Sequence, residues 1–127
     1  MASRAAETLA RLRVCRDAGL PVLPELAADA IEVIEQFLYA AELRDRRDAM
    51  IRRAALLLPD PDAKPYTRAG LLLQEARAMN RTWNILRSKP PENELSTPRA
   101  CLHAARLYAE LPGSQRHFYR VLIRDLT

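Results

Sequence analysis

The chain has 127 residues, of which 49% are hydrophobic and 6% aromatic, and its formal net charge is +4. This length suits a single domain that folds without support from disulfides or metals. Only three glycines occur, while the strong helix formers Ala, Leu, Arg and Glu recur throughout. The two cysteines lack CxxC spacing, which argues against a disulfide framework or a zinc ribbon. The composition therefore favours an all-α protein with reduced thiols.

Targeting signals are absent from the sequence pattern. No run approaches the roughly 18 apolar residues of a membrane span, and the arginine-containing amino terminus lacks the apolar core of a signal peptide. We therefore expect a cytoplasmic protein with no membrane partner. Eighteen of the twenty basic residues are arginine. Arginine suits bidentate contacts to phosphate or carboxylate. A GC-rich bacterial genome would produce the same excess of arginine over lysine, and both explanations stay open.

Two helical patterns precede the first proline-rich segment. Ser3 is placed to cap a helix that Gly19 and Pro21 end. Pro24 then begins the strongest helical period of the chain. Its apolar stripe comprises Ala27, Ala30, Ile31, Ile34, Phe37, Leu38 and Ala41. The pattern reaches Pro59 without Gly or Pro, so it predicts either one long helix over 24–58 or two helices broken near residues 45–48.

Residues 59–65 hold three prolines and predict a linker between an N-terminal and a C-terminal helical group. Thr67 is then placed to cap a third helical unit. Its apolar face comprises Leu72, Ala76, Met79, Trp83 and Leu86. Trp83 should therefore be mostly buried against Leu72, Met79 or a neighbouring helix.

The C-terminal part of the sequence predicts two more helices. Thr97 with Pro98 begins one, and Ser114 caps the other. Their apolar positions are Ala104, Leu107, Tyr108 and Leu111 in the first, and Phe118, Val121, Leu122 and Leu126 in the second. Helix breaks are expected at 19–23, 59–66, 88–96 and 112–114. The predicted fold is a compact all-α bundle of about five helices, one domain over 1–127 with sub-groups 1–58 and 66–127.

Signatures of catalysis or metal binding are weak. His103 and His117 are the only histidines, and Cys101 with His103 is not spaced to hold one metal on a helix. A solvent-facing or capping role is favoured for both histidines. The segment PDPDAK mimics the PD…DxK pattern of metal-dependent nucleases, but it lies in the proline linker rather than on adjoining strands. We expect no enzyme, no metal and no cofactor.

Two rows of basic side chains are the candidate sites. The C-terminal row is Arg116, Arg120 and Arg124, at i, i+4 and i+8, about 12 Å long on a helix. The central row is Arg77, Asn80, Arg81, Asn84 and Arg87, opposite Trp83. Such rows are what contacts to nucleic-acid phosphates require. A solvated helix face gives the same pattern and remains the alternative.

The last two predicted helices also have the layout of a helix-turn-helix, because a short turn with Gly113 joins them. In that motif Gln115, Arg116, Tyr119 and Arg120 would face the DNA groove. Pro112 and Ser114 depart from the motif, so an ordinary αα-hairpin is favoured.

Charge is unevenly distributed along the chain. Residues 1–20 carry a balance of +2, residues 21–48 of −4, and residues 49–127 of +6. The acidic side chains Glu25, Asp29, Glu32, Glu35, Glu42 and Asp45 lie mostly off the apolar stripe and should be exposed. Asp48 is spaced to pair with Arg44 and Arg52 within its own helix.

These observations lead to two functional hypotheses. The first is a non-enzymatic protein that contacts the phosphate backbone of DNA or RNA through its C-terminal arginine rows, alone or as a small subunit or regulator. In outline the chain is similar to the small helical subunits of CRISPR effector complexes, and equally to many phage and plasmid regulators. The second is an adaptor or inhibitor that docks a basic partner protein on its acidic helix 25–48. The oligomeric state is open.

Overall fold

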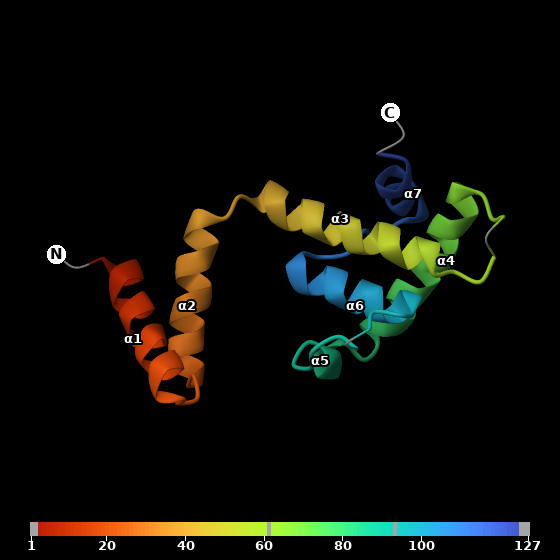
Figure 1. Cartoon of the computed structure of the whole chain (residues 1–127). Coiled ribbons are helices and arrows are strands. Elements are labelled where there is room, and N and C mark those ends of the chain that lie inside the picture. The colour runs from red at the N-terminus through yellow and green to blue at the C-terminus, as the bar shows by residue number, and fades with distance from the viewer. Residues whose placement is uncertain (1–2, 61, 93, 125–127) are drawn as a thin grey trace. The chain divides into compact units, whose positions relative to one another are not determined.

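The computed structural model describes residues 3–60, 62–92 and 94–124. Within these residues the chain forms seven helices and no strand, which confirms the all-α prediction (Figure 1). The helices are α1 (Arg4–Ala18), α2 (Pro24–Phe37), α3 (Ala40–Leu56), α4 (Pro65–Asn80), α5 (Trp83–Leu86), α6 (Pro98–Tyr108) and α7 (Gln115–Ile123). They form two compact units, Met1–Ala40 and Ala41–Thr127. None of the described helices combines the length and apolar character needed to cross a membrane.

Two helix breaks that the sequence pattern did not predict raise the number of helices above five. The predicted helix 24–58 is interrupted at residues 38–39, upstream of the break considered at 45–48. Leu38 ends α2 with an extended backbone, at φ −97° and ψ 135°. Phe37 and Tyr39 beside it are weaker helix formers than the alanines and arginines that follow. The second break, at residues 81–82, separates Trp83 from α4.

The division between the helical groups lies at Ala40 and not at the proline-rich linker. Ile51, Ala54 and Ala55 of α3 belong to the same buried cluster as Leu72 of α4 and Phe118 of α7. The apolar face of α3 is therefore committed to helices that follow the linker. Residues 57–64 connect two helices of one unit, and Pro61 within them lies outside the described residues.

Most of the predicted caps are present. The side chains of Ser3, Thr97 and Ser114 accept hydrogen bonds from the backbone N–H groups of Ala6, Ala100 and His117. Gly19 ends α1 with a left-handed backbone at φ 65°. The prediction for Thr67 was wrong, because α4 begins two residues earlier at Pro65, whose fixed φ suits the first helical position. The breaks at 57–64, 87–97 and 109–114 accordingly differ from the expected ones by a few residues.

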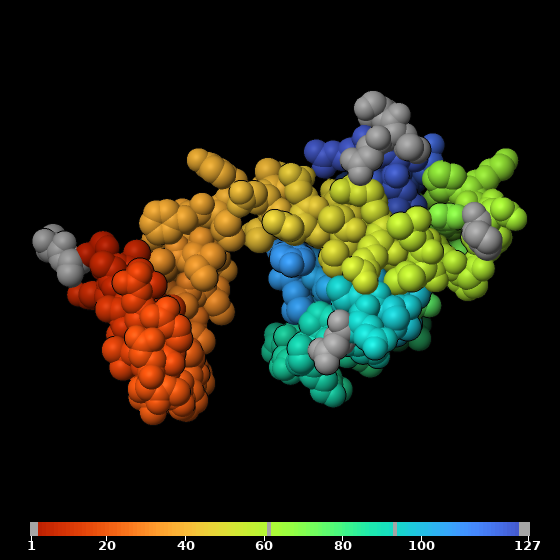
Figure 2. All heavy atoms as spheres, in the orientation of Figure 1, coloured from red at the N-terminus to blue at the C-terminus, as the bar shows by residue number. Residues whose placement is uncertain are grey.

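The core of the second unit is built around α4, which packs closely against both α6 and α7. Its largest fully buried side chains are Ile51, Leu72, Met79, Cys101, Leu102 and Phe118. Figure 2 shows the atoms of α3 (yellow) lying against those of α6 (light blue) without a visible gap. Among the predicted apolar positions of α7, Phe118 and Val121 are buried. Leu126 lies outside the described residues.

A glycine allows α7 to approach α4. A Cβ added at Gly70 would lie 2.8 Å from Nε2 of Gln115, closer than atoms in real structures approach. Gln115 Nε2 donates a hydrogen bond of 2.9 Å to the Tyr66 carbonyl, and the Tyr66 and Tyr119 rings meet edge to face at 5.5 Å. The face of α7 that carries Gln115 and Tyr119 is therefore occupied by α4.

The inward face of α6 differs from the predicted one. Leu107 and Tyr108 are exposed, whereas Cys101, Leu102 and Ala105 are fully buried. Two of the four predicted positions are confirmed, because Ala104 is buried and Leu111 packs against the core. The surface of α6 carries Arg99 in its first turn and the residues of its last turn.

Trp83 is partly buried and packs against the edge of the core, in agreement with its predicted place in the apolar stripe. The guanidinium of Arg106 lies 4.3 Å from its ring centroid, and the His103 ring meets it edge to face at 5.6 Å. His103 is buried, so it is not solvent-facing; its Nε2 lies 2.9 Å from the carbonyl oxygen of Leu86, the last residue of α5. It thus caps that short helix, whereas His117 is exposed.

The first unit is a hairpin of α1 and α2 with little interior (Figure 2, red and orange). Thr8 and Leu26 are its only buried residues in the described part of the unit. Ile31, Ile34 and Phe37, which the sequence pattern placed on an inward stripe, are all exposed. The periodicity of α2 was real, but this hairpin does not cover its apolar face.

We predict that the two cysteines differ sharply in reactivity. Cys101 is buried, and burial raises the pKa of its thiol, an effect that nearby Arg53 partly offsets. Because the thiolate is the nucleophile, Cys101 should react with an aromatic disulfide reagent at pH 8 at least about 100-fold more slowly than half-buried Cys15. Its rate should still rise with pH above about 8.5, where an ordinary thiol has ionised.

The reaction of the wild-type protein should therefore have a fast and a slow phase, which single-cysteine variants assign. Cys15→Ser should leave only the slow phase, and Cys101→Ala should leave only the fast one. Unfolding in denaturant should make both thiols react at similar rates. A fast phase that survives in Cys15→Ser would contradict the burial of Cys101.

Candidate nucleic-acid interface

A cleft of about 360 Å³ lies between α3 and α7 of the second unit. Its charged and titratable lining comprises Arg44, Asp45, Arg47 and Asp48 from α3, and His117, Arg120 and Arg124 from α7 and its end. Four guanidinium groups thus surround two carboxylates, which leaves the cleft cationic. Both helices contribute because α3 and α7 cover the same buried cluster.

Asp48 is the buried anchor of this cleft, with a side chain only 4% exposed. Its carboxylate accepts a hydrogen bond of 2.9 Å from Arg47. Arg47 also donates a 2.7 Å bond to the Glu110 carbonyl, in the connection between α6 and α7. A buried carboxylate needs such partners, because an unpaired charge in a protein interior is costly. The pair ties α3 to the segment that positions α7.

Arg124 belongs to this anchoring network rather than to a free cationic row. It follows the last residue of α7, and its Nη1 lies 3.5 Å from Asp48 and 3.8 Å from Asp45. Sequence spacing placed it correctly on the same side as Arg120, but it could not show that α3 brings two carboxylates to that position.

Arg116 and Arg120 remain exposed on the outer side of α7. Within the described segments neither forms a salt bridge or a side-chain hydrogen bond, and the same holds for Arg44 on α3. Arg44 and Arg120 line one cleft from its two sides. Arg116 lies one helical turn from Arg120, about 6 Å along the axis. These three arginines are the part of the site that can take an external anion.

The central row is not one surface. The break at residues 81–82 places Arg77 and Asn80 on α4 but Asn84 on α5, with Arg81 and Arg87 at helix ends. Asn80 also accepts a hydrogen bond from Arg106. Arg77, Asn80 and Arg106 line a smaller cleft of about 230 Å³ together with Glu110.

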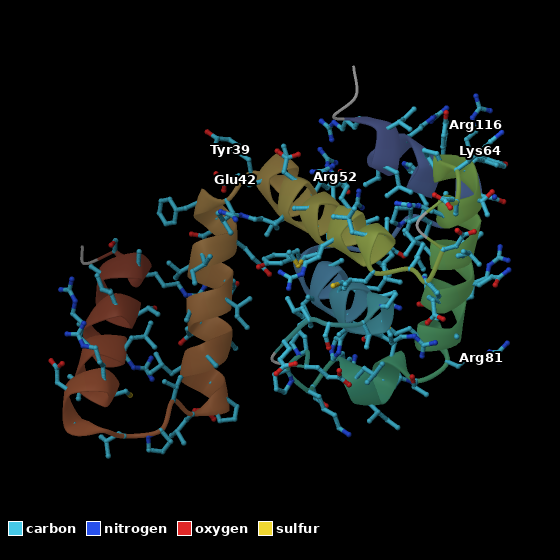
Figure 3. All side chains as sticks on the ribbon, turned by 45° about the vertical axis from the view of Figure 1, so that its right-hand side comes forward. Tyr39, Glu42, Arg52, Lys64, Arg81 and Arg116 are labelled. Atoms are coloured by element: carbon cyan, nitrogen blue, oxygen red, sulfur yellow. The ribbon has the colours of Figure 1, made fainter. Side chains whose placement is uncertain are left out.

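The two rows lie at opposite ends of α4. Figure 3 shows Lys64 and Arg116 at one end of this helix and Arg81 at the other. The hydrogen bond from Gln115 to the Tyr66 carbonyl joins the beginning of α7 to the first turn of α4. With sixteen residues, α4 is about 24 Å long. The C-terminal and central arginines therefore do not merge into one patch.

The helix-turn-helix arrangement is not supported by the contacts of α7. Gln115 and Tyr119, which would face the groove, contact Tyr66 of α4 instead. Only Arg116 and Arg120 of the four groove-facing candidates point away from the protein core. The close packing partner of α7 is α4 rather than α6, so the last two helices do not form a tight αα-hairpin either.

The acidic residues of 25–48 divide between two units. Asp48 is buried and Asp29 is half-buried, whereas the other five are exposed. In the first unit Arg4 pairs with Asp29 at 2.9 Å and with Glu32 at 2.7 Å, and Arg11 contacts Asp29 at 3.5 Å. In the second unit Arg124 pairs with Asp45. Glu25, Glu35 and Glu42 form no ion pair among the described residues. Most of this pairing uses N-terminal arginines. Of the C-terminal row, Arg124 pairs with the acidic segment, whereas Arg116 and Arg120 form no ion pair among the described residues.

Sequence reasoning missed Arg44, which it assigned to a helical pair with Asp48. The signal was present: Asp48 lies three residues before Ile51 and seven before Ala55, on the inward face of α3, so its carboxylate turns towards the core. Arg44 is then left at the rim. In the described ranges no three His, Cys, Asp or Glu side chains are grouped to hold a metal ion.

Comparisons with family models, curated proteins and solved structures gave no match to this chain. The site is therefore described from its own geometry. Its defining features are the buried Asp48–Arg47 pair and the three exposed arginines Arg44, Arg116 and Arg120.

We predict that Asp48→Asn lowers the free energy of unfolding by about 3 kcal/mol, because it leaves the Arg47 guanidinium, whose side chain is only 14% exposed, without a counter-charge. Urea unfolding followed by circular dichroism measures the change. Asp45→Asn is the matched control: its carboxylate is exposed and 3.8 Å from Arg124, so its effect should stay within about 0.5 kcal/mol. Equal stabilities of the two variants would contradict the anchoring role of Asp48.

Proposed function

We propose that the second unit binds the phosphate backbone of nucleic acid at the α3–α7 cleft and along the outer side of α7. The observation that supports this most directly is the trio Arg44, Arg116 and Arg120, exposed and without an acidic partner among the described residues. Each guanidinium offers a planar fork of donors that matches two phosphate oxygens. The protein would act alone, as a regulator, or as a small subunit of a nucleoprotein assembly.

The distribution of charge supports this choice of partner. The second unit carries sixteen basic and ten acidic residues, a net charge of +6, whereas the first unit carries −2. A concentrated positive charge attracts a polyanion and speeds its association. Affinity then grows with the number of phosphates that are neutralised, and it falls as salt rises.

The arrangement of the site favours contacts to the backbone over readout of bases. The basic side chains flank the α3–α7 cleft. Gln115 and Tyr119, the polar and aromatic neighbours suited to bases, contact α4. Contacts to phosphates carry no direct sequence information. We therefore expect similar affinities for unrelated sequences.

The adaptor hypothesis has less support. Its docking surface was one acidic helix over 25–48, but that range spans two helices in two units. Asp29, Glu32 and Asp45 already form ion pairs within the protein. The exposed acids that remain do not form a single helical face.

The proposal predicts a defined change in salt dependence. Arg116→Ala/Arg120→Ala should weaken binding of a duplex of about 20 base pairs and lower the slope of log affinity against log salt by about two units, close to one per lost phosphate contact. Arg44→Ala should lower the slope by about one unit. Fluorescence anisotropy over a salt series, with two unrelated sequences and one single strand, measures both. Folding should be unchanged, because these side chains are exposed; Arg124 is left in place because it pairs with Asp48.

Arg81→Ala/Arg87→Ala is the matched control, since it removes the same charge from exposed positions at the ends of α4 and α5, away from the cleft. It should leave the slope unchanged. An equal effect of the control would show attraction to net charge rather than to the cleft. Wild-type protein that binds neither single nor double strands at low salt would refute the proposal.

A further inference from the structure

The α1–α2 hairpin has one apolar side that nothing in its own unit covers. Leu9, Leu23, Ile31, Ile34 and Leu38 are all exposed. Ile31 and Ile34, in the middle of α2, are 57% and 54% exposed. These five residues are called the hairpin face below.

Helical geometry places these side chains on one side of the hairpin. The buried residues Thr8 and Leu26 mark where α1 and α2 face each other. At about 100° per residue, Leu9 lies about a quarter turn around α1 from Thr8. Ile31 and Ile34 lie a similar angle around α2 from Leu26. Because the two helices run antiparallel, these rotations lead to the same side.

The opposite side of the hairpin is polar and already paired. Arg4 bridges Asp29 and Glu32 there, and Arg11 reaches Asp29. The hairpin is thus amphipathic as a whole, and its polar side joins α1 to α2. Only the apolar side is left without a partner within the unit.

Two helices cannot enclose a core. Fewer than about 40 residues rarely bury enough apolar surface for independent stability, and antiparallel helix pairs commonly complete their core as four-helix bundles. A continuous apolar face of this kind marks an interaction surface.

We propose that the hairpin face binds the hairpin face of a second copy of this chain, so that two hairpins form a four-helix bundle. The charges that are not already paired on the opposite side favour this occupant. Exposed Arg13 remains on α1, and exposed Glu25 and Glu35 remain on α2, none of them in an ion pair among the described residues. A two-fold axis parallel to the helices sets α1 of one copy against α2 of the other, basic against acidic and antiparallel. One patch that matches itself is what two-fold symmetry requires.

The register of such a dimer is also self-consistent. Leu9 lies nine residues before the end of α1, and Ile31 and Ile34 lie seven and ten residues after the start of α2. Measured from the turn, Leu9 is therefore at a height of about 13 Å, between Ile31 and Ile34. Leu9 of one copy therefore meets Ile31 and Ile34 of the other at a matching level.

The exposed large apolar residues of the second unit offer a poorer partner. Leu56, Tyr66, Ile85 and Leu107 are spread over α3, α4, α5 and α6. Each is on a different helix, so they do not form a stripe that matches α1 and α2. Docking of the hairpin on the same chain remains an outcome that the experiment distinguishes.

Light scattering on the eluting full-length chain tests the proposal. Wild-type protein at about 50 µM should have twice the 14.4 kDa mass of the chain, and Ile31→Glu/Ile34→Glu should shift the dissociation constant at least 100-fold towards monomer, since two charges would be buried without partners. Leu56→Glu/Ile85→Glu is the matched control, with the same chemistry at exposed positions of the second unit. It should remain dimeric.

Cross-linking tests the register without a destabilising charge. Leu9→Cys and Ile34→Cys chains, each also carrying Cys15→Ser and Cys101→Ala, should form disulfide heterodimers when mixed and oxidised, at a higher yield than either chain alone. Monomeric wild-type protein overturns the proposal, including the case in which the same chain covers its own hairpin face. A dimer that survives Ile31→Glu/Ile34→Glu, or that the control dissociates, overturns it as well.

Discussion

The second unit depends on one buried charge. Asp48 turns inward from α3, and its carboxylate must be neutralised because almost none of it reaches solvent. Arg47 supplies the counter-charge and, through the Glu110 carbonyl, fixes the connection that leads into α7. Arg124 closes the same network from the far end of α7. A helix of only nine residues is thereby held at both ends by α3, in addition to its packing on α4.

This anchoring decides which arginines are left for a partner. Arg47 and Arg124 form ion pairs with carboxylates of α3, so their positive charges are neutralised within the protein. Arg44, four residues before Asp48, and Arg120, four before Arg124, lie one turn away at the rim of the same cleft. Two of the four arginines of the cleft, Arg47 and Arg124, are therefore structural, whereas Arg44 and Arg120 stay available at the surface. Packing of the two helices fixes the backbone at these arginines, whereas their exposed side chains still lose rotamer freedom when they contact a phosphate.

The sequence predicted where helices form better than which helices pack against each other. Pro24, Pro98 and the serine and threonine caps locate helix starts through local chemistry, so the all-α fold and most breaks followed from the residues alone. The break at residues 38–39 has neither Gly nor Pro and escaped notice. Leu107 shows a second limit: its exposure depends on which neighbouring helix approaches, and periodicity does not encode that tertiary choice. For the site, the spacing found Arg116 and Arg120, but only the fold separated them from Arg124 and added Arg44.

The apolar stripe of α2 shows that periodicity can also predict burial where a unit leaves side chains exposed. The sequence pattern placed Ile31 and Ile34 in a core, yet both are exposed in the unit to which they belong. An apolar stripe predicts that a helix has an apolar side, while the surface that covers this side is a separate inference. If the hairpin face joins two chains, each dimer carries two α3–α7 clefts. Two linked sites raise the local concentration of protein on a long polyanion, so modest phosphate contacts at each cleft would add up to firm binding. Self-association by the first unit and phosphate binding by the second would then support each other without any shared residue.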